Sequence, residues 1–357
     1  MDAGVDIDAL TAWMDARGLG EGPVEAMRPL TGGSQNIVVL FSRADRDYVL
    51  RRPPLHPRPN NNETMRREAR LLDALAATPV PHPTLIAACE DESVLGACFY
   101  LMAPIDGFNP VSGLPPLHAG CAEIQHRMGL AAVEALVTLG AQDYRSLGLE
   151  GFGKPDNYLQ RQVSRWRSQL QSYYDLPGWP GAAALGDVDA VGRWLEHHCP
   201  AGISSGIMHG DFHMANVMFK HDGPELAAII DWELATIGDP LIDFGWLLAT
   251  WPDAGEERTT SIQPWIGFPS AAELIAHYKT CGGRTLGDVE WYAIFGCYKL
   301  GILLEGTHAR SRAGKAPMEI GEKLHNRAVL LFARAERWLR NGMPGAPGKD
   351  SMRHERA

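Results

Sequence analysis

The sequence predicts an α+β protein of two lobes, a small lobe rich in strands followed by a larger helical lobe. Short apolar runs separated by turn residues fill the N-terminal part, whereas segments with apolar residues at helical spacing fill the rest. The chain of 357 residues can bury the cores of both lobes. Residues 103–107 (Ala-Pro-Ile-Asp-Gly) break the pattern, so we expect residues 1–103 in the first lobe, residues 104–340 in the second, and a disordered tail at residues 341–357.

The elements of the first lobe follow from local patterns. Leu10, Trp13 and Met14 lie at helical spacing, so residues 8–17 are predicted to form an amphipathic helix. Turn-forming residues at 31–36 precede an aliphatic run, which is typical of two strands joined by a turn. The other elements expected here are strands at residues 48–51 and 94–102, a helix at residues 63–76, and a proline-rich loop at residues 53–59.

The second lobe is predicted to be mainly helical because apolar residues recur at helical spacing. Its helices are expected at residues 125–139, 158–173, 243–250, 271–279, 288–304 and 320–339. A hairpin is also expected, since residues 217–219 and 226–230 are apolar and the His-Asp-Gly-Pro segment between them favours a turn. The hairpin would return the chain so that Asp231 lies close to Asn216.

Two short motifs flank this hairpin and carry the most specific functional signal. Residues 209–216 read His-Gly-Asp-Phe-His-Met-Ala-Asn, and residues 229–233 read Ile-Ile-Asp-Trp-Glu. Protein kinases place a catalytic Asp, a metal-binding Asn and a second metal-binding Asp in a similar pattern. We therefore expect Asp211 to orient the attacking hydroxyl and accept its proton, and Asn216 and Asp231 to bind Mg²⁺.

Other interpretations of these residues are open at this point. Asp and Asn also cap helices and form turns. His209 and His213, together with the two aspartates, offer a ligand set for zinc, which a metal-dependent hydrolase would use. The kinase spacing accounts better for the whole pattern, and it leaves His209 the structural task of supporting the catalytic loop.

Together the two motifs resemble those of the aminoglycoside phosphotransferase family, which are small-molecule kinases with a protein-kinase-like fold. The resemblance runs from about residue 30 to about residue 339. It is greatest to bacterial phosphotransferases related to the kinase-like domain of some acyl-CoA dehydrogenases. It implies an ATP site in the cleft between the lobes and a small-molecule alcohol as the acceptor. It also implies that Asp243 supports the catalytic loop without reacting.

The resemblance further implies the residues that bind the nucleotide. The loop over the phosphates would consist of Gly32, Gly33 and Ser34, since glycine lets backbone N–H groups approach an anion. Arg51 stands where a protein kinase has a lysine, and its partner would be Glu68 or, alternatively, Glu63. The carbonyl of Ala103 and the N–H of Ile105 would bind adenine, because the proline between them has no N–H.

The composition bears on partners and location. A formal net charge of −10 argues against nucleic acid as the main partner. The six cysteines include no C-x-x-C pair, which predicts reduced thiols in a cytoplasmic protein. The chain does not open with a basic segment followed by an apolar stretch, and it has no run of 18 apolar residues. We therefore expect neither a signal peptide nor a membrane span.

The expected function is the ATP- and Mg²⁺-dependent phosphorylation of a hydroxyl group on a small molecule, such as an aminoglycoside-like or hydroxyacyl-CoA compound. His308, Arg310, Arg312 and Lys315 favour an anionic acceptor if they face the cleft, and otherwise they form a solvated loop. An alternative of another class is a protein of the same fold that binds nucleotide or senses a ligand without catalysis. The arginine at position 51 is the feature that favours this alternative.

Overall fold

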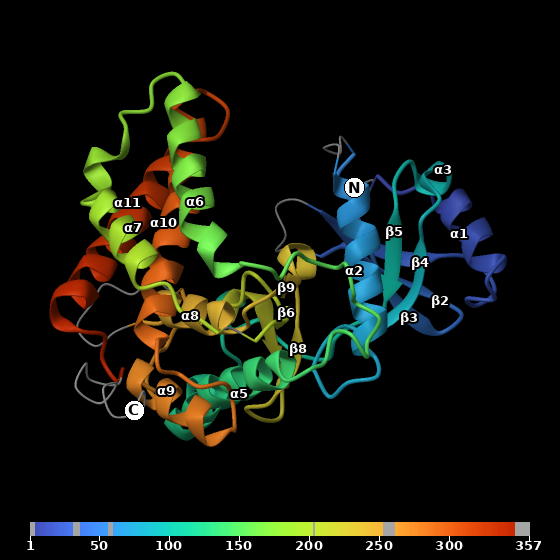
Figure 1. Ribbon diagram of the computed structural model, residues 1–357. Coiled ribbons are helices and arrows are strands. Elements are labelled where there is room, and N and C mark those ends of the chain that lie inside the picture. The colour runs from blue at the N-terminus through green and yellow to red at the C-terminus, as the bar shows by residue number, and fades with distance from the viewer. Residues whose placement is uncertain (1–3, 31–35, 56–59, 203, 253–260, 347–357) are drawn as a thin grey trace.

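The computed structural model describes residues 4–30, 36–55, 60–202, 204–252 and 261–346. The N-terminal part contains an antiparallel five-stranded sheet with the strand order β1-β2-β3-β5-β4 (Figure 1). Its strands are β1 (Glu25–Pro29), β2 (Ile37–Arg43), β3 (Arg46–Arg52), β4 (Leu85–Cys89) and β5 (Phe99–Met102).

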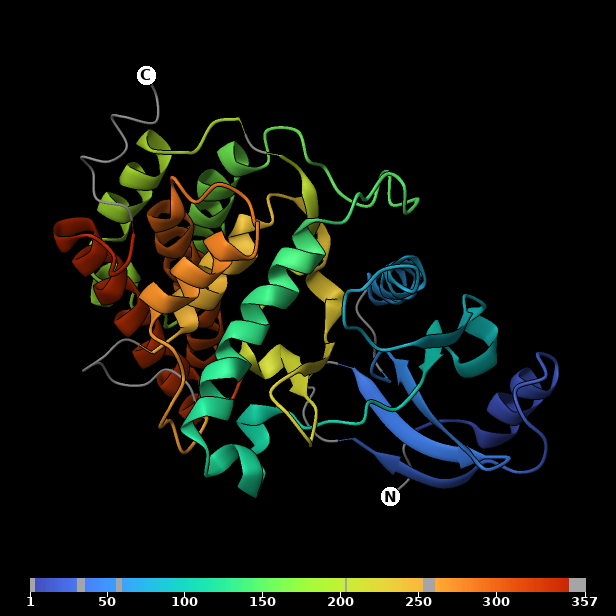
Figure 2. The ribbon, with the colours of Figure 1, turned by 90° about the horizontal axis from the view of Figure 1, so that it is seen from below.

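Helices cover both faces of this sheet. The outer face carries α1 (Ile7–Asp15) and the short α3 (Glu92–Leu95), and the inner face carries α2 (Asn61–Leu75), which lies between the sheet and the rest of the molecule (Figures 1 and 2). Side chains of a strand alternate between faces, so Phe99 and Leu101 pack with α1 whereas Tyr100 packs with α2. Arg51 pairs with Tyr100 across the sheet and therefore also faces α2.

The other described residues are mainly helical. The α-helices of this part are α4 (Pro116–Ala119), α5 (Ala122–Gly140), α6 (Gln162–Gln171), α7 (Val188–His197), α8 (Leu241–Thr250), α9 (Ala271–Thr280), α10 (Val289–Arg312) and α11 (Met318–Asn341). Two short antiparallel strand pairs lie among them: β6 (Gly206–Met208) with β9 (Thr236–Gly238), and β7 (Val217–Phe219) with β8 (Leu226–Ile229).

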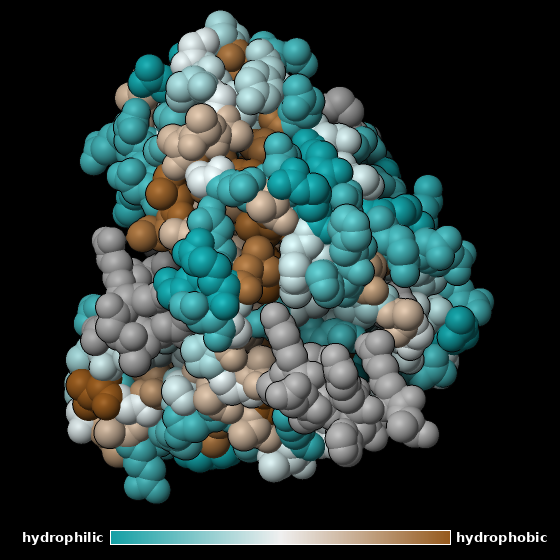
Figure 3. All heavy atoms as spheres, turned by 60° about the vertical axis from the view of Figure 1, so that its left-hand side comes forward, coloured by the Kyte–Doolittle hydropathy of each residue, from teal (hydrophilic) through white to brown (hydrophobic). Residues whose placement is uncertain are grey.

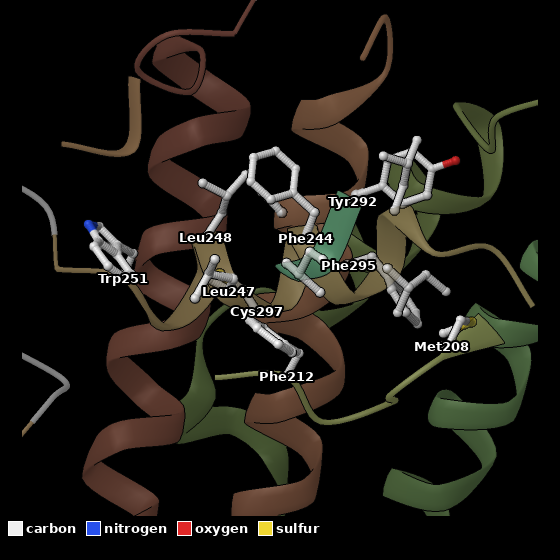
Figure 4. Close-up of a cluster of buried hydrophobic side chains, with 14 of the residues drawn as sticks. Met208, Phe212, Phe244, Leu247, Leu248, Trp251, Tyr292, Phe295 and Cys297 are labelled. Atoms are coloured by element: carbon white, nitrogen blue, oxygen red, sulfur yellow. The ribbon is translucent and has the colours of Figure 1, made fainter. Parts of the chain in front are cut away.

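The centre of the helical part is the contact between α8 and α10. Nine of the ten residues of α8 are buried, so this helix is surrounded by protein on all sides. Gly245 and Gly296 allow the two helices to approach closely: a Cβ at Gly245 would collide with the Tyr292 carbonyl, and one at Gly296 would lie 2.8 Å from the Gly245 carbonyl. Phe212 is fully buried in the same hydrophobic core (Figure 4), so the loop that follows β6 is anchored in the core.

The predicted α+β class is confirmed, because the sheet lies within residues 25–102 and the larger helical part follows it. The helices predicted at residues 8–17, 63–76, 125–139, 243–250, 271–279 and 320–339 are present with bounds that differ by a few residues. The chain leaves β5 for the helical part through residues 103–107. A domain boundary after residue 103 stays a prediction.

The strand predicted at residues 94–102 is correct only for its second half. Residues 92–95 form α3 because the Asp91 side chain accepts a hydrogen bond from the Ser93 N–H and caps the helix. Gly96 ends α3 in the left-handed conformation, with φ of +76°. The apolar pattern alone did not reveal this capped turn, and the strand begins only at Phe99.

Other elements extend the prediction or differ from it. β4 and α7 were not predicted, and the helix expected at residues 158–173 is divided into 3₁₀ turns and α6. In the expected tail, Met343 is buried and its N–H donates to Glu290 Oε1 at 3.0 Å, so the disorder does not begin at residue 341; residues 347–357 lie outside the described residues. Within the described residues, no helix has both the length and the hydrophobicity of a membrane span.

Candidate active site

Asp243, at the start of α8, fixes the loop that carries Asp211. Its Oδ2 accepts the N–H of His209 at 2.6 Å and its Oδ1 accepts the N–H of Gly210 at 2.8 Å. The carboxyl is almost fully buried, and burial raises its pKa while the two N–H donors oppose that rise. Asp243 thus occupies the supporting position that the resemblance implied for it.

The Gly210 backbone and the His209 ring set the shape of the loop that carries Asp211. Gly210 has φ of +86°, and a Cβ there would collide with the Leu234 carbonyl, so the position requires glycine. The His209 ring is fully buried, with Nε2 2.9 Å from the Ile230 carbonyl and Nδ1 3.3 Å from the Asp211 nitrogen. Burial lowers the pKa of His209, so the neutral ring donates through Nε2 and accepts through Nδ1. Both ring nitrogens are therefore occupied, which contradicts a zinc site built on His209.

Asp211 and Asn216 are joined by direct hydrogen bonds. Asn216 Nδ2 donates to the Asp211 carbonyl at 2.9 Å and to Asp211 Oδ2 at 3.1 Å. The Asp211 side chain is 29% exposed, whereas Asn216 is 8% exposed. His213 Nε2 lies 3.4 Å from the other carboxylate oxygen of Asp211. The Asp211 carboxylate is thus held in place but open to a ligand. The Asn216 amide nitrogen faces Asp211, so the amide oxygen of Asn216 is directed away from this carboxylate.

The predicted hairpin brings Asp231 to this pair. Val217 and Ile229 are partners in the β7–β8 ladder, and the Ile230 N–H donates to the Asn216 carbonyl at 2.9 Å. Asp231 follows at once in the left-handed conformation, with φ of +66°, which Asp tolerates better than most residues. The hairpin and the approach of residue 231 to residue 216 are therefore confirmed.

Arg51 links the sheet to this loop. Its Nη2 lies 2.8 Å from Asp231 Oδ1 and 3.9 Å from Glu233 Oε2, while its Nε lies 2.9 Å from Glu68 Oε2. Tyr100 donates its hydroxyl to the same oxygen of Glu68 at 2.8 Å. Glu68 is therefore the partner of Arg51, and the alternative partner, the exposed Glu63, instead lies 3.9 Å from Arg66.

The charges around Arg51 favour the binding of a further cation. Burial lowers the pKa of Arg51, but the fields of Glu68, Tyr100 and Asp231 outweigh it and the net pKa is raised. Burial, and then the repulsion from Asp231, raise the pKa of Glu233. Three carboxylates thus converge on one guanidinium, with Asp211 on the neighbouring loop. Such an excess of oxygen ligands suits a divalent cation.

Lys299 on α10 is a site residue that the sequence did not reveal. Its Nζ donates to the Gly210 carbonyl at 2.8 Å and lies 4.3 Å from the centre of the Trp246 ring. Burial lowers its pKa to about 8, although the negative charges of Asp211 and Asp243 oppose this. No local pattern marks Lys299, because it lies 88 residues beyond Asp211 in the chain. Glu233, in contrast, stands within the second sequence motif, but the motif gave it no role of its own.

The other predicted nucleotide-binding residues are placed only in part. Ala103 donates its N–H to the Thr84 carbonyl at 2.9 Å. Among the described residues, neither the Ala103 carbonyl nor the Ile105 N–H has a protein partner, so both can still bind a ligand. The predicted loop over the phosphates, Gly32, Gly33 and Ser34, lies outside the described residues.

A cavity of about 840 Å³ opens beside the predicted catalytic loop, residues 209–216. His213, Met214 and Ala215 form one wall. Its other lining residues come from five segments and are mostly apolar: Val111, Thr250, Trp251, Pro252, Ser261, Trp265, Leu300, Leu304, Lys323, Asn326, Arg327, Val329 and Leu330. The face that carries α11 shows apolar residues within a largely hydrophilic surface (Figure 3). This cavity is the candidate acceptor site.

The basic residues near the end of α10 belong to another network. His308, Arg310 and Arg312 lie on this helix, so the expected solvated loop is not found there. His308 Nδ1 lies 2.9 Å from Glu305 Oε1, and Arg312 Nη1 lies 3.6 Å from a Glu322 oxygen. None of these basic residues lines the cavity, so they give no support for an anionic acceptor.

A model of the phosphotransferase enzyme family matches residues 26–273. The chain belongs to this family. The matched range includes the five-stranded sheet from its second residue, the catalytic loop, the hairpin and α8. The match therefore includes Asp211, Asn216 and Asp231, whereas Lys299 on α10 lies beyond it.

Relatives in animals share this phosphotransferase region within longer proteins. The chain is 33% identical over 331 residues to acyl-CoA dehydrogenase family member 11 of Gallus gallus, and 30% identical over 308 residues to family member 10 of Mus musculus. These matches cover 88% and 83% of this chain but 40% and 27% of the relatives. The chain thus corresponds to their kinase-like region.

Solved phosphotransferase structures have the same fold. A proposed aminoglycoside phosphotransferase from Ralstonia eutropha matches with a TM-score of 0.76 and 28% identity, over 93% of this chain and 99% of that one. A complex of aminoglycoside phosphotransferase APH(4)-Ia with AMP-PNP and hygromycin B matches with a TM-score of 0.58 and 16% identity, over 92% and 99% of the two chains. The GDP complex of aminoglycoside 2′-phosphotransferase-IIIa matches with a TM-score of 0.61 and 14% identity, over 93% of this chain and 98% of that one.

Proposed function

We propose that this protein transfers the γ-phosphate of ATP, with Mg²⁺, to a hydroxyl group of a small molecule. The observation that carries the proposal is the hydrogen-bonded grouping of Asp211, Asn216 and the Asp231 loop, next to the ion pair between Arg51 and Asp231. Phosphoryl transfer depends mainly on positioning and charge neutralisation, and this arrangement offers both. Membership of the phosphotransferase family agrees with it.

The donor set at this point fits Mg²⁺. Asn216 and Asp231 would hold the ion, because the Asn216 amide nitrogen is engaged with Asp211 and leaves its oxygen for a metal. The Asp231 carboxylate is 38% exposed and open to a ligand. When bound, the ion would neutralise charge on the nucleotide phosphates.

Asp211 is the group that receives the proton of the acceptor. The acceptor oxygen forms a bond to the γ-phosphorus while the bond from phosphorus to the bridging oxygen breaks, and its electron pair leaves with ADP. The hydroxyl proton passes to the Asp211 carboxylate. Asp243 and Lys299 hold the loop, through its N–H groups and through the Gly210 carbonyl, and act as positioning residues.

The nucleotide would lie between the sheet and the catalytic loop. The Ala103 carbonyl and the Ile105 N–H would bind the base, and the loop of Gly32, Gly33 and Ser34 would cover the phosphates. Arg51 would contact the phosphates while Glu68 orients it. Because Arg51 pairs with a helix glutamate as a kinase lysine does, its presence does not favour the non-catalytic alternative.

The acceptor is proposed to be a hydroxyacyl-CoA type of compound in preference to an aminoglycoside. The cavity beside the catalytic loop is mostly apolar, contains Lys323 and Arg327, and has no carboxylate among its lining residues. A polycationic aminoglycoside would need carboxylates there, whereas an acyl chain with an anionic group suits this lining. The relatives named as acyl-CoA dehydrogenase family members support the same choice.

Mass spectrometry of candidate acceptors after incubation with ATP and Mg²⁺ tests this function. The expected result is a hydroxyacyl-CoA that gains one phosphate with wild-type protein, and gains it far more slowly with Lys323→Gln or Arg327→Gln. Phosphorylation of aminoglycosides but not of hydroxyacyl-CoA compounds would reject the acceptor class and leave the kinase activity standing.

A further inference from the structure

A second cavity, of about 900 Å³, lies between α2 and the start of α6 and shares no lining residue with the cavity beside the catalytic loop. Four of its lining side chains are cationic, and we call this site the basic pocket: Arg67, Lys154, Arg161 and Arg165. None of its lining residues is Asp or Glu. The pocket is thus strongly positive on a chain whose formal net charge is −10.

Its positive charges lack carboxylate partners. Among the described residues, none of the four cationic side chains of the basic pocket forms an ion pair. Arg67 Nη2 donates only to backbone carbonyls, those of Phe152 at 2.8 Å and Ala235 at 3.1 Å, and its guanidinium lies 4.1 Å from the centre of the Phe152 ring. A partly buried guanidinium without a counter-charge is unfavourable, and a bound anion would remove this cost.

The pocket is formed before a ligand arrives. Arg161 donates to the backbone carbonyls of Asp156 and Lys154, and thereby closes the loop that leads into α6. Lys154 and Arg165 are exposed, and the Arg165 guanidinium lies 5.5 Å from the centre of the Trp166 ring, so the charged ends of both side chains can reach a ligand. Arginine binds phosphate through two parallel N–H donors, which matches the three guanidinium groups here.

We propose that the basic pocket binds the phosphate group of a small anionic ligand, at a site apart from the proposed nucleotide cleft. The ligand is either inorganic phosphate or a larger compound that carries a phosphate. The proposal does not rest on the proposed function, because it concerns residues that take no part in the transfer step.

The position of Arg67 connects this site to the nucleotide cleft. Arg67 precedes Glu68, which pairs with Arg51, and the Ala235 carbonyl that it binds lies four residues after Asp231. A phosphate bound to Arg67 would therefore change the hydrogen bond through which α2 contacts the segment that follows Asp231. Reciprocity then requires nucleotide binding and phosphate binding to affect each other.

Calorimetric titration of the full chain with inorganic phosphate and with pyrophosphate, at saturating AMP-PNP and Mg²⁺, tests the proposal. We expect binding to wild-type protein, and a loss of roughly tenfold or more in Lys154→Gln/Arg165→Gln, which removes two charge-assisted contacts. The matched control Arg193→Gln/Lys279→Gln removes two exposed charges elsewhere and should bind as wild type does. Tighter binding of pyrophosphate than of phosphate would identify the larger class of ligand.

Hydrogen exchange locates the bound anion independently of affinity. With phosphate present, amides of residues 150–168 and of α2 should exchange more slowly, and this protection should vanish in the double variant. No binding to wild-type protein, unchanged affinity in Lys154→Gln/Arg165→Gln, or protection confined to other segments would each overturn the proposal.

Discussion

Arg51 Nη2 lies 2.8 Å from Asp231 Oδ1, so the central strand of the N-terminal sheet is joined directly to the loop after the β7–β8 hairpin. The same guanidinium holds Glu68 through its Nε, at 2.9 Å. A lysine has a single ammonium and could not hold both carboxylates in this fork geometry. The arginine is therefore part of a consistent network, and its loss should affect nucleotide binding before it affects the chemical step.

Arg51→Lys tests this network. We expect KM for ATP to rise by about tenfold, with a smaller change in kcat, because the single ammonium cannot span Glu68 and Asp231. Arg46→Lys on the same strand is the matched control, since Arg46 is exposed and remote from the site. Steady-state kinetics would contradict the assignment if Arg51→Lys and Arg46→Lys had the same KM.

Asp211→Asn should remove the proton acceptor while keeping the shape of the loop. We expect kcat to fall by about a hundredfold or more, and the affinity for AMP-PNP to stay close to that of wild type. Asp222→Asn, in the exposed turn of the hairpin, provides the control. Wild-type turnover in Asp211→Asn would remove Asp211 from the mechanism.

Asn216→Ala and Asp231→Ala should act on the metal. Each loses an oxygen ligand, so the Mg²⁺ concentration that gives half-maximal activity should rise clearly. Titration of Mg²⁺ at saturating ATP measures this effect. An unchanged Mg²⁺ requirement in both variants would reject their role as ligands.

Lys299 should give the activity an alkaline limit. Burial lowers its pKa to about 8, so the ammonium is intact below that pH and loses its proton as the pH rises through it. We expect kcat to decline above about pH 8, because the charge beside Asp211 disappears. Lys299→Met should have a low kcat without this limb, whereas the exposed Lys279→Met keeps it. An identical alkaline limb in Lys299→Met would show that another group titrates.

Gly210→Ala should impair both folding and activity. The substitution adds a Cβ that collides with the Leu234 carbonyl, and it strains a residue with φ of +86°. Gly282→Ala is the matched control, because Gly282 has φ of +70° but nothing within 4 Å of its Cβ position. Urea unfolding should show a loss of about 1 kcal/mol in Gly282→Ala and more in Gly210→Ala. Equal losses would mean that the contact with Leu234 has no weight.

The parts of the site that the sequence predicted are those that lie close together in the chain. Asp211, Asn216 and Asp231 are separated by one hairpin, and the apolar runs and turn residues of that hairpin are visible in the sequence. The partner of Arg51 was predicted as Glu68 or Glu63, and only the packing of α2 against the sheet distinguished them. Local sequence pattern thus identifies candidate residues for the site, and tertiary packing decides which of them are in contact.

The parts that the sequence did not reveal depend on distant packing. Lys299 donates to the Gly210 carbonyl from α10, a helix that packs closely against α8 at Gly245 and Gly296. The helix at residues 92–95 forms because one aspartate caps it, which outweighs the apolar character of Val94 and Leu95. The loop of Gly32, Gly33 and Ser34 stays a prediction.

The most direct test of the central claim is Mg²⁺-dependent release of ADP from ATP across a panel of acceptors. The panel would include hydroxyacyl-CoA compounds, aminoglycosides, macrolides, amino alcohols and sugars, with Asp211→Asn measured beside wild-type protein. We predict a release of ADP that one acceptor class stimulates and that Asp211→Asn abolishes. Stimulated release that persists unchanged in Asp211→Asn would contradict the assigned active site. Nucleotide binding with no stimulation by any acceptor would contradict the kinase account and favour a non-catalytic, ligand-sensing protein.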